Sequence, residues 1–281
     1  MFSAGNDGAN EGATIGSHAA AKNCLTVGAC NSKRERGVTP RLIPSWSGRG
    51  PTKEGRIKPD VVAPGAVVRS TDSYYRLMKY STYTCRSGTS MAAALVSGCV
   101  ALLRQALRTN GNHPVQNPTS ELLKALIING AVLGMGGRTK EGFGCVNLTN
   151  SLSMLAQNSF GGYETASVTL SQPKKFTLPI PEVDPGQRPT LMVTVVHIDS
   201  AGGILLANLV LLVEGRNNDG SVSRRYGNMG TNEHNYDEDN NVQQVKWLEI
   251  PFEKVEITVN AKKFDDINRD SQKYALAWRV F

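Results

Sequence analysis

The sequence predicts two domains of different fold class, an α/β domain over residues 1–158 and an all-β sandwich domain over residues 165–281. In the first part, short apolar runs typical of buried strands alternate with longer segments whose apolar residues recur at helical spacing. In the second part, strand-like runs follow one another between turn residues, with almost no helical pattern. A chain of 281 residues is long enough for two domains of ordinary size.

Two strands and two helices carry the α/β prediction. The expected strands are the cores of NCLTVGACN (23–31) and KPDVVAPG (58–65), and the expected helices are SMAAALVSGCVALLRQAL (90–107) and SELLKALIINGAVLG (120–134). Each strand segment holds β-branched or apolar residues between turn formers. The second helix follows the break at Pro118, so either Thr119 or Ser120 is available as its N-cap.

Four strands carry the all-β prediction, and turn residues such as NNDG (217–220) separate them. The strand segments are TLMVTVVHID (190–199), ILLANLVLLVEG (204–215), KVEITVNAKKF (254–264) and KYALAWRVF (273–281). The stretch NSFGGYE (158–164) is predicted to link the two domains. NEHNYDEDNN (232–241) is predicted to be a polar, acidic loop.

The composition describes a folded, basic protein, with 40% hydrophobic and 20% charged residues and a net charge of +7. Its densest basic groups, KRER (33–36) and GRIK (55–58), lack the interleaved aromatic residues of single-strand binders. A solvated basic face is therefore favoured over nucleic-acid contact. The longest apolar stretch stops at Arg104, short of the ~20 residues that a bilayer requires, so no membrane span is expected. No signal peptide is recognised at Met1.

Five cysteines are too few and too irregularly spaced to predict a disulfide scaffold; they are Cys24, Cys30, Cys85, Cys99 and Cys145. None forms a C-x-x-C pair, which leaves a zinc site without support. Cys24 and Cys99 lie in apolar stretches and are predicted to be buried free thiols. The odd number leaves at least one thiol unpaired within the chain.

Ser90 stands between the glycine turn at Gly88 and a run of small apolar residues that is predicted to be helical. Serine is among the best N-cap residues, so a purely structural role is one interpretation. The other is a nucleophile, because a hydroxyl at a helix N-terminus is exposed on a rigid element, and the unpaired N–H groups there favour a developing oxyanion. The motif alone leaves both open.

Five segments, in order, resemble the subtilisin-like serine proteases (subtilases). They are SAGNDG (3–8), GSHAAAKNCLTVGA (16–29), SWSGRGPTKEGRIKPDVVAPG (45–65), RSGTSMAAALVSG (86–98) and GFGCVNL (142–148). The fourth is similar to the G-T-S-M-A motif that holds the family's nucleophile. The resemblance implies a subtilisin-like, doubly wound parallel sheet, here incomplete, and a serine endopeptidase that cleaves proteins or peptides without a catalytic cofactor.

The resemblance also implies roles for individual residues. Ser90 would be the nucleophile, and the side-chain amide of Asn6 would hold the oxyanion together with the backbone N–H of Ser90. For Thr89, a place beside the oxyanion hole and a local turn-stabilising role fit equally well. The residues implied to line the substrate pocket are Ser3, Ala4, Gly5 and Thr89.

The triad partners of Ser90 are not expected in this chain. In subtilases the aspartate and histidine motifs precede the oxyanion segment, and only five residues precede Asn6 here. None of the four histidines is expected to replace the general base; they are His18, His113, His197 and His234. We therefore expect the C-terminal part of a longer, monomeric protease, whose residues 1–158 expose apolar surface. The alternative is an inactive remnant whose sandwich binds a protein or glycan surface.

Residues 165–281 resemble the jelly-roll sandwich that follows the catalytic domain in some subtilases. The segments that carry this likeness are LMVTVVHIDS (191–200), LLANLVLLV (205–213), RYGN (225–228) and NNVQQV (240–245). Where the family pattern has acidic residues, this chain has Ala207, Asn208 and Val210, which weakens support for a structural Ca²⁺ site. The remaining carboxylates fit a solvated loop better than a calcium site; they are Asp199, Asp237, Glu238 and Asp239. The family resemblance implies an extracytoplasmic protein.

Overall fold

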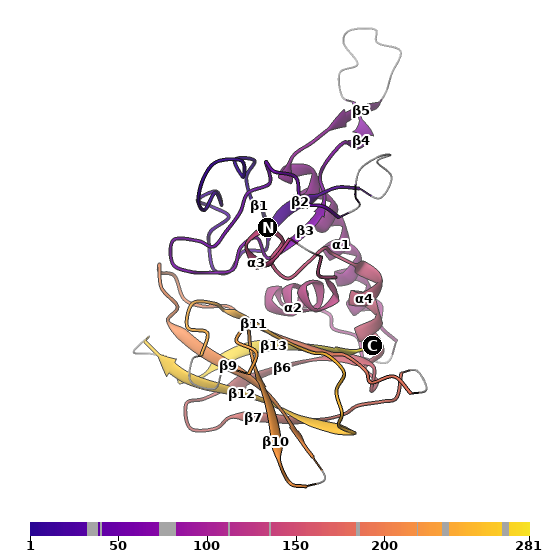
Figure 1. Cartoon of the computed structure of the whole chain (residues 1–281), viewed down its shortest axis with the longest axis vertical. Coiled ribbons are helices and arrows are strands. Elements are labelled where there is room, and N and C mark those ends of the chain that lie inside the picture. Colours follow the sequence, from indigo (N-terminus) through magenta and orange to yellow (C-terminus); the bar gives the residue numbers. More distant parts are fainter. Residues whose placement is uncertain are drawn as a thin grey trace. The chain divides into compact units, whose positions relative to one another are not determined.

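The computed structural model describes residues 1–32, 39, 41–72, 83–111, 113–134, 136–183, 186–217, 219–231, 236–265 and 270–281. The chain forms two compact units (Figure 1). Unit 1 comprises Met1–Ala101 and Ala131–Val146, and unit 2 comprises Leu102–Gly130 and Asn147–Phe281. These bounds differ from the domains expected at 1–158 and 165–281, and that division stays a prediction.

Unit 1 contains a parallel sheet in the order β1-β2-β3; its strands are β1 (Phe2–Ser3), β2 (Thr26–Cys30) and β3 (Val61–Pro64). All five residues of β2 are buried, as expected for a parallel strand covered on both faces. Phe2 pairs with Thr26, and Val27 pairs with Val61. Both strands expected in the α/β part are confirmed.

The helix α1 (Thr89–Thr109) begins in unit 1, and its residues from Leu102 on belong to unit 2. An antiparallel hairpin of β4 (Val68–Thr71) and β5 (Tyr83–Arg86) precedes it. A short helix, α3 (Arg138–Glu141), lies further along the chain. The helix expected over residues 90–107 is confirmed. The hairpin was not predicted, because its strands carry mostly exposed polar residues without a clear alternation.

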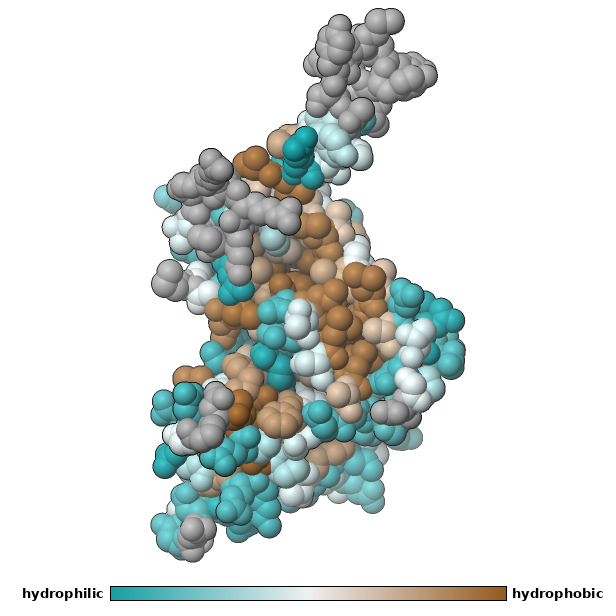
Figure 2. Space-filling view, turned by 90° about the vertical axis from the view of Figure 1, so that its right-hand side faces the viewer, coloured by the Kyte–Doolittle hydropathy of each residue, from teal (hydrophilic) through white to brown (hydrophobic). Residues whose placement is uncertain are grey.

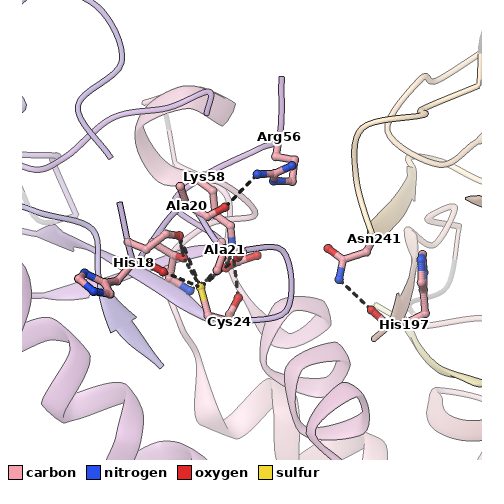
Figure 3. A network of polar contacts seen from close by, with 11 residues as sticks. His18, Ala20, Ala21, Cys24, Arg56, Lys58, His197 and Asn241 are labelled. Carbon is pink, nitrogen blue, oxygen red and sulfur yellow. Dashed lines mark hydrogen bonds and ion pairs between the residues drawn. The ribbon is translucent and has the colours of Figure 1, made fainter. Parts of the chain in front are cut away.

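A buried ion pair stabilises the start of β2 in unit 1. The Nζ atom of Lys58 lies 2.7 Å from Oδ2 of Asp60, and both side chains are 2% exposed. The same Oδ2 accepts the N–H of Thr26 at 2.7 Å, and Lys58 also donates to the carbonyl of Cys24 at 3.0 Å (Figure 3). The expected solvated basic face is therefore wrong for residues 55–58, because Arg56 is buried as well. Residues 33–36 lie outside the described part.

The cysteines differ from expectation in their burial. Cys24 and Cys99 carry thiols, as predicted, but they are only partly buried. The thiols enclosed in the core are Cys30 and Cys145, which lie in a cluster with Val62.

Unit 2 includes α2 (Ser120–Gly130), which is buried along nearly its whole length. Thr119 caps this helix, because its Oγ1 accepts the N–H of Leu122 at 3.4 Å, which decides between the two expected caps. Asn129 accepts a hydrogen bond from the hydroxyl of Thr194 at 2.9 Å, which ties α2 to a strand of the neighbouring sheet. The helix ends at Gly130, four residues before the predicted end at residue 134. The chain continues through α4 (Leu148–Ser153).

Two antiparallel sheets of four strands complete unit 2, in the orders β10-β9-β12-β7 and β11-β8-β13-β6. The strands are β6 (Gly161–Val168), β7 (Lys174–Pro179), β8 (Leu191–His197), β9 (Ala207–Arg216), β10 (Val222–Tyr226), β11 (Val242–Trp247), β12 (Lys254–Phe264) and β13 (Gln272–Val280). One core joins them, with Leu211 and Ile257 from the first sheet and Val193 and Leu276 from the second. The four predicted strands are confirmed. The expected linker is wrong beyond Asn158–Phe160, because β6 begins at Gly161 and pairs with β13.

Apolar side chains are exposed in unit 1, as expected from the sequence. Met1, Phe2 and Leu95 are 42%, 45% and 44% exposed. Figure 2 looks onto the side of the molecule where Figure 1 labels α1, and it shows a large apolar area there. Among the residues that the structure describes, α1 is the one helix long and apolar enough to cross a membrane, by length and composition only. The absence of a membrane span stays a prediction.

Candidate active site

The N-terminus of α1 positions Ser90. The helix begins at Thr89, so the flanking cap position falls on Gly88 and Ser90 lies in the first turn. Ser90 is exposed, whereas Thr89 is buried. Gly88 has a φ of +155°, and a Cβ atom there would lie 3.5 Å from Nδ2 of Asn6. A Cβ atom would be in ordinary contact with Asn6 there, so it is the positive φ that favours glycine at this position.

Asn6 meets the start of α1 although the two are more than 80 residues apart in sequence. Its Oδ1 atom accepts the backbone N–H of Thr89 at 2.9 Å and the hydroxyl of Thr89 at 3.1 Å. An N–H group can only donate, so this contact determines which end of the amide is the oxygen. The Nδ2 group consequently points away from Thr89 and lies beside Gly88. Asn6 is thus held through its acceptor, and its donor end is directed toward the turn that precedes Ser90.

Three of the four residues expected to line the substrate pocket run from β1 toward Asn6, and the fourth is Thr89. Ser3 pairs with Val27 in the parallel sheet, and the N–H of Ala4 donates to the carbonyl of Val27 at 2.8 Å. The N–H of Gly5 donates to Oγ1 of Thr89 at 3.2 Å. Thr89 therefore bridges Gly5 and Asn6, which places the predicted site residues in one cluster.

A pocket of about 360 Å³ opens beside Ser90, between the β4–β5 hairpin and the first turns of α1. Its lining residues are Val68, Ser70, Thr71, Thr84, Arg86, Ser90, Met91, Ala94 and Leu95. The side of the hairpin is mostly polar, and the helix side is mostly apolar. Within the described part of the chain, this lining contains no histidine and no carboxylate that would activate Ser90.

The described histidines have other neighbours. The ring of His18 stacks on Phe2 with ring centroids 5.9 Å apart, and its carbonyl faces Cys24 (Figure 3). In unit 2, His113 is exposed, and the buried ring of His197 lies 2.9 Å from the carbonyl of Ala207 through Nε2. His234 lies outside the described residues.

Of the four carboxylates considered for calcium, Glu238 and Asp239 are exposed, as expected of a solvated loop. The expectation is wrong for Asp199 and Asp237, which are buried and hydrogen-bonded to backbone N–H groups. Asp199 accepts from Leu206 at 2.8 Å and from Ala207 at 2.9 Å, one bond to each oxygen. Oδ1 of Asp237 accepts the N–H groups of Asp239 and Asn240, both at 3.1 Å. Among the residues that the structure describes, no three His, Cys, Asp or Glu side chains gather in a way that could hold a metal ion.

Sequence reasoning missed two features of the site. The first is the double contact of Thr89 with Asn6; the local sequence gives no signal for a contact over this separation. The second is the hairpin wall of the pocket, for which the closely spaced polar residues of β4 and β5 gave only a weak strand pattern. The available signal was limited to the separated β-branched residues Val68, Thr71 and Thr84.

A comparison with protein families matches residues 1–165, more than half of the chain, to the Subtilase family. The serine protease AprX of Bacillus subtilis is 33% identical over 165 residues, which cover 53% of this chain and 34% of AprX. Pyrolysin of Pyrococcus furiosus is 31% identical over 55% of this chain and 12% of its own length. Among solved structures, the CspB protease of Clostridium perfringens is 31% identical, with a TM-score of 0.42, over 52% of this chain and 29% of that protein. The matched part of this chain covers about a third of the length of AprX and a smaller share of the other two relatives.

Proposed function

Because the chain belongs to the Subtilase family, we propose that it carries the nucleophile and the oxyanion-binding groups of a serine endopeptidase. The observation that carries this proposal is the pair of hydrogen bonds by which Thr89 fixes the acceptor end of Asn6. The amide N–H of Asn6 is thereby available beside the turn that leads to Ser90.

In the proposed reaction, Oγ of Ser90 attacks the scissile carbonyl carbon and forms a tetrahedral intermediate, then an acyl-enzyme. The negative oxygen is stabilised by the side-chain N–H of Asn6 and by the backbone N–H of Ser90 at the start of α1. In subtilisin itself, loss of one such amide donor costs about 3–4 kcal/mol of transition-state stabilisation. We expect a loss of the same order when Asn6 is replaced by Ala.

The substrate is proposed to be an extended protein or peptide segment. Ser3, Ala4 and Gly5 would form one wall of the pocket for the residue before the scissile bond, mainly through backbone groups. Thr89 is buried between Gly5 and Asn6, so we assign it a positioning role. The pocket along α1 and the hairpin provides room beside Ser90 for a further protein segment.

The general base and its carboxylate partner are proposed to come from a part of the full-length protease that precedes Asn6. The support is the lining of the pocket beside Ser90, which within the described residues offers no proton acceptor of suitable chemistry. Without these groups, a site of this kind loses about six orders of magnitude in turnover. This chain alone is therefore expected to be nearly inactive.

For unit 2 we propose a jelly-roll module of the kind that follows the catalytic domain in some subtilases. The strand orders β10-β9-β12-β7 and β11-β8-β13-β6 support this topology, because successive strands alternate between the two sheets across one core, apart from β9 and β10, which pair as a hairpin. We propose that Asp199 and Asp237 organise loops of this module, since backbone N–H groups already bind both oxygens of Asp199 and Oδ1 of Asp237, and the side-chain amide of Asn228 binds Oδ2 of Asp237. An extracytoplasmic, monomeric full-length protein is proposed from the family alone.

Labelling with a fluorophosphonate probe tests the proposed site in this chain and in the full-length protease. Labelling should disappear in Ser90→Ala and fall strongly in Asn6→Ala. Ser97→Ala is the matched control, because Ser97 is also exposed on α1 but its hydroxyl donates to the carbonyl of Ala93 at 2.9 Å. If folded full-length protein is not labelled at Ser90, the proposal is refuted and the inactive remnant with a protein- or glycan-binding sandwich is favoured.

A further inference from the structure

Cys30 and Cys145 meet in the core of unit 1. Their sulfur atoms lie 3.8 Å apart, and the residues are 115 positions apart in sequence. Cys30 is fully buried and Cys145 is 9% exposed, in a cluster with Val62 against which Ile43 packs. We propose that Cys30 and Cys145 form a disulfide when the chain folds in an oxidising environment. This cross-link is independent of the function proposed for Ser90.

The geometry requires a small movement. A disulfide has a sulfur–sulfur distance of about 2.05 Å, so the two atoms must approach each other by about 1.8 Å. Cys30 is the last residue of β2, and Cys145 lies in a short segment held by isolated bridges to Val62 and Val132. Residues at the end of a strand and in such a segment adjust more readily than residues inside a continuous ladder. Among the described residues, no metal-binding group of three ligands competes for these thiols.

The oxidant is a small disulfide such as oxidised glutathione. The thiolate of one cysteine attacks a sulfur of the oxidant, forms a mixed disulfide and releases one glutathione thiolate. The thiolate of the second cysteine then attacks the protein sulfur of the mixed disulfide and releases the second glutathione. The two protein sulfurs lose two electrons in total, and their two protons pass to the two released thiolates.

The environment of Cys30 indicates when the bond forms. Its hydrogen bond with Cys145 and its burial raise the pKa of the Cys30 thiol above the ordinary value. A thiol with a raised pKa is rarely deprotonated and therefore reacts slowly. The bond is expected to form during folding, before the sulfurs are enclosed, and to resist added reductant afterwards.

The cross-link would support the turn that carries the nucleophile. The carbonyl of Cys30 accepts the N–H of Gly65 at 2.9 Å, and the carbonyl of Gly65 accepts the N–H of Gly88 at 2.9 Å. A disulfide at Cys30 therefore restrains the strand end on which Gly88 is anchored. It also closes a long loop, which restricts the unfolded chain and raises the urea midpoint of unit 1.

Peptide mapping tests the cross-link directly. The chain is refolded with reduced and oxidised glutathione, denatured, treated with iodoacetamide and digested with trypsin without reduction. The expected product joins residues 23–33 to residues 141–174; it lacks two hydrogen atoms relative to the sum of the free peptides and carries one carbamidomethyl group on the cysteine left outside the bond. The first peptide contains both Cys24 and Cys30, so the map is repeated with Cys24→Ser, in which the product must persist.

Two results would overturn the proposal. One is quantitative alkylation of Cys30 and Cys145 after oxidative refolding. The other is loss of the cross-linked product in Cys24→Ser, which would show that Cys24, and not Cys30, forms the bond. Cys145→Ser should lack the product, but the wild-type and Cys24→Ser maps decide the question even if Cys145→Ser fails to fold.

Discussion

Replacing Asp60 by Asn is expected to destabilise unit 1 strongly, because it leaves the ammonium group of Lys58 in the core without its counter-ion. The amide can still accept the N–H of Thr26, which isolates the effect of charge from that of this hydrogen bond. Of the described partners of its Nζ atom, Lys58 then retains the carbonyl of Cys24 at 3.0 Å and a weak contact with the Cys24 sulfur at 3.8 Å.

The size of the effect follows from distance and burial. At 2.7 Å and an effective dielectric constant of about 20, the attraction between the two charges is about 6 kcal/mol. Desolvation of the two ions offsets much of this in the intact pair, but a single remaining ion keeps its own desolvation cost. Breaking a buried pair on one side costs about 3–5 kcal/mol, and we expect this range for Asp60→Asn. Domains are stable by only about 5–15 kcal/mol, so the change is large.

Urea unfolding followed by tryptophan fluorescence measures this loss. Trp46 is the only tryptophan of unit 1, so Trp247 and Trp278 are replaced by Phe in all variants to report on unit 1 alone. Glu54→Gln is the matched control in the same unit: Glu54 pairs with Arg56 at 2.8 Å, but its side chain is 40% exposed. Because water screens that pair, the control should change the free energy of unfolding little.

The double variant Lys58→Met/Asp60→Asn separates a lost charge pair from a local defect. It removes both charges and keeps an acceptor for Thr26, so most of the stability lost in Asp60→Asn should return. The reasoning would be refuted if Asp60→Asn cost no more than Glu54→Gln. It would equally be refuted if the double variant were as unstable as the sum of the two single variants.

Three further outcomes are expected. Thr89→Val should slow probe labelling of the full-length protease about five- to tenfold, because Asn6 loses one of its two donors, whereas Thr89→Ser should label at nearly the wild-type rate. Gly8→Ala should destabilise unit 1, because a Cβ would lie 1.9 Å from a backbone carbonyl oxygen, whereas Gly98→Ala in α1 has open space and should stabilise the helix by about 0.5–1 kcal/mol; urea midpoints compare the two. Burial raises the pKa of Tyr274, so its contribution to stability is present below pH 10.0 and lost as the pH rises toward the folded pKa; the stability difference between wild type and Tyr274→Phe should therefore change between pH 9 and 11 and be constant below.

The buried elements of both units were predictable because their sequences carry a local pattern. β2 and β3 read as apolar runs between turn residues, and α1 shows helical spacing over several turns. β7 and β10 were missed because each short segment contains two adjacent cations that break the apolar alternation, and pairing with the neighbouring strands orders these segments. Strand pairing between distant segments is a tertiary effect that local propensity does not encode.

The basic run at residues 55–58 shows a different limit. Clustered cations usually mark a solvated face. This expectation failed because Asp60, two residues after Lys58, is buried beside it and pairs with its ammonium group. The carboxylate neutralises the lysine and also accepts the N–H of Thr26, so one side chain satisfies two buried donors. A charge count along the sequence does not reveal such sharing, because it depends on where β2 and β3 lie in the sheet.

In the candidate site, too, the sequence predicted what short motifs encode and missed what depends on contacts between distant residues. Ser90 and Asn6 were identified from short motifs, but the orientation of Asn6 depends on Thr89, which the sequence left between two roles. The two roles are compatible, because the contacts that hold Thr89 in the turn also orient the amide of Asn6. These contacts lie within unit 1 and involve no titrating group, so in the proposed site the amide of Asn6 is oriented without any general base. On this proposal, a segment that supplies the base has to position only its own proton acceptor against Ser90, because the proposed oxyanion donors are already held by this chain.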